Sequence, residues 1–151
     1  MVTQAYAELN PEEYLGRDIF LNSKDDLVIS SKDDLSQVRY YNNLTQAIVN
    51  RLRTAFGELE LHPNYGCRLH ELIGTNPNQL TLSLAQMHVR EALLQEPRVE
   101  EIVSINPSFR NNTNNQIIDI DITVTPIKGL NTLNLVYSVF LWGKKNGYIR
   151  F

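Results

Sequence analysis

The chain has 151 residues, of which 42% are apolar and 21% are charged, and its formal net charge is −3. This length and composition predict a single globular domain over 1–151 and exclude a disordered or collagen-like chain. The acidic balance argues against general nucleic-acid binding, which needs clustered positive charge. A single cysteine excludes an internal disulfide, and no apolar run is long enough to span a membrane.

Charge is distributed unevenly along the chain. Residues 1–41 carry eight acids against four bases, whereas the C-terminal tail, 143–151, carries three bases and no acid. The N-terminal segment, 1–15, lacks the basic-then-apolar order of a secretion signal. We therefore expect no membrane insertion, and a basic tail that stands apart from the rest of the domain.

Three helices are predicted in the first two thirds of the chain. Asn10 and Pro11 are typical of a short helix start, and residues 43–56 place their apolar side chains on one helical face. The longest helix, 78–95, begins after a proline and ends before Pro97. Its apolar side chains form two stripes, one of Leu82, Ala85, Val89, Ala92 and Leu93, the other of Leu80, Leu84, Met87 and Leu94. Such a helix is either covered on both sides within its own domain, which we favour, or gives one face to a partner.

The remaining elements are predicted to be strands. Short apolar runs at 18–21 and 27–30 flank an acidic turn and predict a small hairpin. Strict alternation at 118–125 predicts a strand with one buried and one wet face, between further strands at 102–109 and 133–141. The last of these is apolar on both faces, so it is covered twice or its second face awaits a partner. The order of elements predicts an α+β fold with a mainly antiparallel sheet packed against about three helices.

A metal site is not expected from the histidines and the cysteine. His62, Cys67 and His70 fall close together, but a structural zinc site usually needs four ligands and a catalytic site three plus water. A fourth ligand is missing nearby and the spacing matches no zinc finger. We therefore predict no metal and no cofactor.

Paired carboxylates raise the alternative of glycoside hydrolysis. That chemistry needs two carboxylates about 5–9.5 Å apart, and the candidates are Glu58 with Glu60 and Asp119 with Asp121. Two threonines share the strand face of the aspartates, which is typical of a solvated sheet surface. Neither a Gly-x-Ser-x-Gly elbow nor a phosphate-binding loop is present. We therefore predict no catalytic residues.

The tripeptide Glu96-Pro97-Arg98 follows the longest helix. Proline fixes the backbone where the helix stops, with a carboxylate and a planar guanidinium on either side. Arginine favours bidentate pairing and anchors many interfaces. Taken alone, the tripeptide is equally typical of a helix end with exposed charges.

Several short elements, taken together in order, resemble a known family. They are Gly16–Ile19, Asn43–Ile48, Arg51–Thr54, Gly57–Leu59, His62–Leu69, Glu91–Leu93 and Glu96–Val99. This order resembles the baseplate wedge, or sheath-initiator, family of contractile phage tails, which has members in type VI secretion and other contractile injection systems. The resemblance covers roughly residues 16 to 141.

The resemblance implies a structural protein of the tail baseplate. Family members occur in six copies around the tail tube, and their Glu-Pro-Arg segment, here Glu96, Pro97 and Arg98, contacts the core bundle of the larger wedge proteins. They also accept extended strands from the first ring of sheath protein, and tube or hub proteins lie nearby. We therefore expect a non-enzymatic virion component, assembled in the host cytoplasm, that initiates the sheath. A tailocin or secretion machine, a tail-associated peptidoglycan hydrolase and a soluble regulator remain alternatives.

Overall fold

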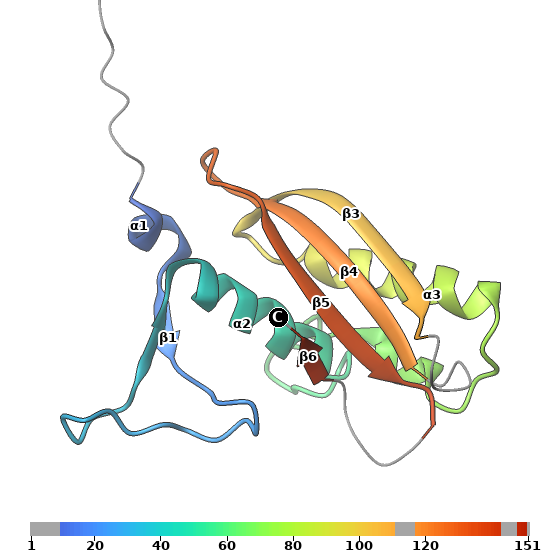
Figure 1. The fold of residues 1–151 in the computed structure, drawn as a ribbon, viewed down its shortest axis with the longest axis horizontal. Coiled ribbons are helices and arrows are strands. Elements are labelled where there is room, and N and C mark those ends of the chain that lie inside the picture. The colour runs from blue at the N-terminus through green and yellow to red at the C-terminus, as the bar shows by residue number, and fades with distance from the viewer. Residues whose placement is uncertain (1–9, 111–116, 143–147, 151) are drawn as a thin grey trace, which may run out of the picture.

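The computed structural model describes residues 10–110, 117–142 and 148–150. The elements run in the order α1 (Pro11–Leu15), β1 (Arg17–Ile19), β2 (Gln37–Arg39), α2 (Tyr40–Arg53), the 3-10 helix η1 (Arg68–Leu72), α3 (Gln79–Leu93), β3 (Val99–Phe109), β4 (Ile117–Pro126), β5 (Leu133–Phe140) and β6 (Tyr148–Arg150). Two antiparallel sheets, β1-β2 and β3-β4-β5-β6, combine with these helices (Figure 1). This arrangement confirms the predicted α+β class. Within the described ranges, no helix has the length and apolar character needed to cross a membrane.

The N-terminal hairpin forms, but with a different pairing from the one predicted. β1 pairs with β2 rather than with the apolar run that follows it. The two predicted runs meet only at a single antiparallel bridge between Leu21 and Leu27. Two acidic turns, at which Asp25 and Asp33 take left-handed backbone conformations, fold the intervening segment back twice. The predicted pairing of 18–21 with 27–30 was therefore wrong. The two turns carry the chain past the nearer run, and β2 pairs with β1 instead.

The core lies between the helices and one face of the larger sheet. On β4, the alternating side chains that were predicted to be buried are fully buried; they are Ile118, Ile120, Ile122 and Val124. They pack in one apolar cluster with residues of α2, η1 and α3. The opposite face of β4 carries aspartates and threonines, as its alternation predicted.

The larger sheet has a fourth strand, β6, which was not predicted from the sequence and which lies beside β5. β6 pairs antiparallel with Val136–Ser138, in the middle of β5. On the outer face of β5, Val136 and Phe140 are half-buried and Ser138 is buried, so the apolar second face of this strand is partly covered. The remaining residues of the basic tail (143–147 and 151) and the polar connection 111–116 lie outside the described residues.

Only one of the two apolar stripes of α3 is covered by the chain itself. On the inner stripe Ala85, Val89, Ala92 and Leu93 are buried, and Leu82 is half-buried. On the outer stripe Leu80, Met87 and Leu94 are 65%, 44% and 67% exposed. The favoured prediction, that both stripes are buried within the domain, is therefore wrong. The sheet lies against one side of α3 and no other described element covers the opposite side (Figure 1).

Candidate functional site

The Glu96-Pro97-Arg98 turn is tied into the fold by its two charged side chains. Glu96 is only 5% exposed. Its Oε1 accepts a hydrogen bond of 2.6 Å from Nε of Arg98. The same guanidinium donates through Nη1 to the carbonyl oxygen of Leu15, at the end of α1, over 3.3 Å. The turn after α3 is thereby joined to the N-terminal segment.

A second arginine approaches the same carboxylate from α2. Nη2 of Arg51 lies 3.5 Å from Oε2 of Glu96, and both side chains are buried. The Arg51 guanidinium also lies over the ring of Tyr65, 4.5 Å from its centroid. Burial raises the pKa of the Tyr65 hydroxyl, an effect that the positive charge of Arg51 opposes. We call Arg51, Glu96 and Arg98 the Glu96 clamp, because together they hold α1, α2 and the turn after α3.

The clamp is charged inside and apolar at its surface. A shallow depression of about 300 Å³ lies beside it, lined by Arg51, Tyr65, Gln95 and residues 61–64. Leu61, on its rim, is 90% exposed. Leu94 and Pro97, the chain neighbours of Gln95 and Glu96, are exposed as well. The turn therefore exposes Pro97 and apolar neighbours at the surface, whereas the Glu96 carboxylate faces inward. Partner binding by Glu96, Pro97 and Arg98 stays a prediction.

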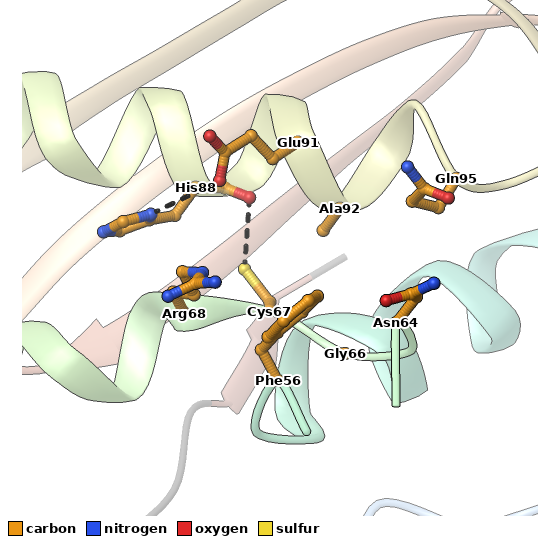
Figure 2. Close-up of a pocket in the computed structure, with 9 residues that line it drawn as sticks. All are labelled: Phe56, Asn64, Gly66, Cys67, Arg68, His88, Glu91, Ala92 and Gln95. Atoms are coloured by element: carbon orange, nitrogen blue, oxygen red, sulfur yellow. Dashed lines mark hydrogen bonds and ion pairs between the residues drawn. The ribbon is translucent and has the colours of Figure 1, made fainter. Parts of the chain in front are cut away.

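A cavity of about 430 Å³ lies between α3 and the loop before η1 (Figure 2). In it, the Cys67 thiol donates to the carbonyl oxygen of His88 over 3.4 Å. Burial raises the pKa of this thiol to about 11. A thiol that stays protonated near neutral pH is a poor nucleophile and a poor metal ligand. Cys67 therefore acts as a buried packing residue.

The candidate metal ligands lie in different environments. Cys67 is buried, whereas His62 and His70 are exposed. His70 uses Nδ1 in a contact of 3.1 Å with the carbonyl oxygen of Cys67. Within the part of the chain that the structure describes, no three His, Cys, Asp or Glu side chains are grouped closely enough to hold a metal ion.

The four candidate hydrolytic carboxylates lie as two pairs, one on β4 and one in the loop after α2, and two of the four have structural partners. Asp119, on the outer face of β4, accepts two hydrogen bonds from Arg110, of 2.8 Å to Oδ2 and 2.5 Å to Oδ1, and one of 2.6 Å from Ser138. This bonding to Asp119 raises the pKa of the Arg110 guanidinium.

The other three candidate carboxylates lie at or near the protein surface. Asp121 lies two residues further along β4 and is exposed. Glu58, in the loop after α2, accepts from the Ala55 N–H over 2.9 Å, and Glu60 is exposed nearby. None of the four lines the cavity of Figure 2 or the depression beside the clamp, as far as the described residues go. Neither pair therefore lies in one of these two hollows.

Arg51 and Tyr65 belong to the segments that carry the family resemblance, but their contacts with the Glu96 carboxylate and with each other, like the pairing of Arg110 with Asp119, were not predicted. Arg51 falls on the polar face of the predicted helix 43–56, so its pattern predicts exposure. Its burial comes from contacts with Glu96 and Tyr65, which lie far away along the chain. No local signal reveals such a residue.

Comparison with known proteins identifies the family. Residues 17–129 match the family described as the contractile injection system sheath initiator. The chain belongs to the sheath-initiator family. The match includes the whole Glu96 clamp and ends before β5. This sheath initiator is therefore a structural component, associated with the sheath and baseplate, of a contractile injection system.

A comparison with solved structures finds a similar fold. A crystal structure of a protein from Geobacter sulfurreducens, described as a candidate tail lysozyme, is similar at 29% sequence identity with a TM-score of 0.59. The similarity covers 80% of this sheath initiator and all of that chain. A search of curated proteins gives no significant match. The lysozyme description belongs to the Geobacter protein.

Proposed function

We propose that this sheath initiator is a non-enzymatic baseplate component that connects the wedge proteins to the first sheath ring and accepts extended strands from sheath subunits. Family membership is the observation that carries the proposal. Strand acceptance is a form of β-augmentation, in which the backbone groups of a sheet edge bind a donated strand. An antiparallel sheet of four strands, which has two edge strands, supports this reading.

Uncovered apolar surface supports a role between several partners. Besides the outer stripe of α3, the N-terminal hairpin exposes Leu27 and Ile29, which are 58% and 69% exposed. A soluble monomer rarely exposes large contiguous apolar patches, and such patches mark interaction sites. The hairpin extends away from the larger sheet (Figure 1), so it and α3 can contact different neighbours.

The larger wedge proteins are the proposed partners of the turn after α3. Glu96 and Arg98 set the shape of that turn, and Pro97 with the exposed Leu61 and Leu94 forms its outer surface. We also propose that each baseplate contains six copies of the protein and that they contact tube or hub proteins. The assembly is proposed to be the virion of a contractile-tailed phage.

Loss of the protein tests the general role. Machines assembled without it should form tube and baseplate particles that carry no sheath, and restoring the protein should restore the sheath. Sheathed particles in its absence would contradict the proposal.

Substitution of the exposed leucines tests the wedge contact. The double change Leu61→Glu and Leu94→Glu should leave folding intact, because both side chains are largely exposed. It should abolish co-purification with wedge proteins, because it places charges in an apolar contact. Val103→Glu is the matched control, since Val103 is also exposed but lies on β3. Normal incorporation of the double variant would refute the assignment.

Peptidoglycan hydrolysis is the alternative function, favoured by the description of the Geobacter protein. It receives less support from the geometry. A catalytic acid needs a site in which its proton can be transferred to substrate, whereas Asp119 is engaged by Arg110 and Ser138.

A further inference from the structure

The two sides of the larger sheet, at β3 and at β5, differ in whether their backbone groups can pair with an additional strand. At the β3 margin, the Arg110 N–H donates to the carbonyl oxygen of Ile117, at the end of the β3–β4 ladder. Because the backbone groups of successive strand residues point to opposite sides, those of Ile105 and Pro107 point away from β4. These are the groups that a strand added to β3 would need.

Both of these positions are closed. Nε2 of Gln86, from α3, donates to the carbonyl oxygen of Ile105 over 2.8 Å. Pro107 has no N–H to offer. The β3–β4 register also shifts twice, between Val99 and Glu101 and between Ile102 and Ser104. Prolines and bulges of this kind are the devices that protect edge strands from pairing.

The β5 margin, in contrast, already holds a strand. β6 pairs with Val136, Tyr137 and Ser138, which are three of the eight residues of β5. The same alternation directs the backbone groups of Val136 and Ser138 toward β6. Asn134 is on the same side of β5 but lies beyond the register of β6. This margin therefore pairs with an antiparallel strand, and the pairing that the structure describes does not include Asn134.

We propose that the outer margin of β5 is the strand-accepting edge, and that β6 is a placeholder which a strand donated by a sheath subunit displaces. This inference rests on the strand acceptance proposed above. A donor that also pairs with Asn134 adds ladder hydrogen bonds to the three residue pairs described for β6, and these additional bonds favour the donor. The isolated protein meanwhile keeps the middle of its edge covered.

The surroundings of this margin fit an incoming strand with apolar side chains on one face. Arg53, on the last turn of α2, lies beside Tyr137 and pairs with Asp25 of the N-terminal hairpin. Arg53 also lines a groove of about 650 Å³ between α2 and that hairpin. Phe20 and Val49 form part of its wall.

A reversible cross-link tests the displacement. Val136 and Arg150 are directly opposite each other in the β5–β6 register. Opposed residues of antiparallel strands have Cα atoms about 4.5–5.5 Å apart, within the range that a disulfide spans. The variant Val136→Cys/Arg150→Cys should therefore form a disulfide that locks β6 in place. Cys67 does not compete, because it is buried.

The assay is attachment of purified sheath subunits to baseplates that contain the oxidised or the reduced double variant. Oxidation should abolish attachment and reduction should restore it in the same preparation. The single variant Val136→Cys controls for the substitution and should attach sheath under both conditions. A chain that ends at residue 142, and so lacks β6, should attach sheath at least as fast as the complete chain.

The outcomes separate this proposal from the general function. Equal attachment by the oxidised and reduced forms would overturn the displacement of β6 while leaving strand acceptance in place. Loss of attachment on removal of β6 would also overturn it, since β6 would then be part of the binding platform. Failure of the complete natural chain to attach sheath would instead refute the proposed function, and this inference with it.

Discussion

Removing one arginine from the Glu96 clamp should destabilise the fold by a measurable amount. In Arg98→Met, the buried Glu96 carboxylate loses its 2.6 Å hydrogen bond and keeps only Arg51 at 3.5 Å. The Leu15 carbonyl oxygen loses a donor as well. A charge-assisted hydrogen bond contributes roughly 1.5–3 kcal/mol, and a buried charge left without its partner costs roughly 3–5 kcal/mol.

The partial exposure of Arg98 reduces this effect. Its side chain is 25% exposed, so water replaces part of the lost interaction. We expect a loss of about 2–3 kcal/mol in the free energy of unfolding, equivalent to a fall in Tm of about 4–12 °C for a chain of this size. Arg98→Glu should be worse, because it brings a second negative charge to Glu96. A charge reversal here therefore tests folding before it tests partner binding.

Urea unfolding followed by far-ultraviolet circular dichroism measures the effect. The double variant Glu96→Gln/Arg98→Met is the control, and should recover part of the loss because the uncompensated charge is gone. Pro97→Ala, which leaves both charges in place, should change stability little. If Arg98→Met unfolds within about 0.5 kcal/mol of the natural chain, the clamp does not stabilise the fold and the reasoning is refuted.

Three further predictions concern other parts of the fold. Gly66→Ala should destabilise by about 2 kcal/mol or more in thermal unfolding, because Gly66 has φ of +110° and an added Cβ would lie 2.6 Å from the Thr54 carbonyl oxygen; a neutral result would contradict this close packing. Burial raises the Cys67 pKa from 9.0 to about 11, so its contribution to stability is complete below pH 9 and is lost as the pH rises toward 11. Urea titrations should therefore show the natural chain losing more stability over that interval than Cys67→Ala, and equal losses would count against the shifted pKa. If the protein has no hydrolase activity, neither the natural chain nor Asp119→Asn should clear peptidoglycan at any pH, and clearing that Asp119→Asn abolishes would revive the alternative function.

Periodicity predicted the parts of the fold in which a single face meets the core. The strand at 118–125 alternates without exception, so its buried residues follow directly from the sequence. The helices at 43–56 and 78–95 were recognised for the same reason, with ends displaced by a few residues. The local sequence pattern was sufficient to predict the buried residues of an element wherever only one side of that element is buried.

Strand pairing and long-range side-chain contacts were harder to predict, because they depend on residues far apart in the chain. Nothing near Asp18 shows that β1 pairs with residues beyond two acidic turns. The burial of Arg51 depends on Glu96, and the exposure of the outer stripe of α3 depends on which elements reach it. The Glu96-Pro97-Arg98 turn was singled out from the sequence, but its inward-facing carboxylate was not expected.

The closed margin of β3 gives the molecule a polarity. Pairing of two copies through β3 is disfavoured, because Gln86 occupies the carbonyl oxygen of Ile105 and Pro107 lacks an N–H. If strands are added at the β5 side, as proposed above, sheet growth is therefore favoured on one side of each copy. Subunits of this kind are less prone to merge into a continuous ribbon, which reduces the risk of fibre formation at high local concentration.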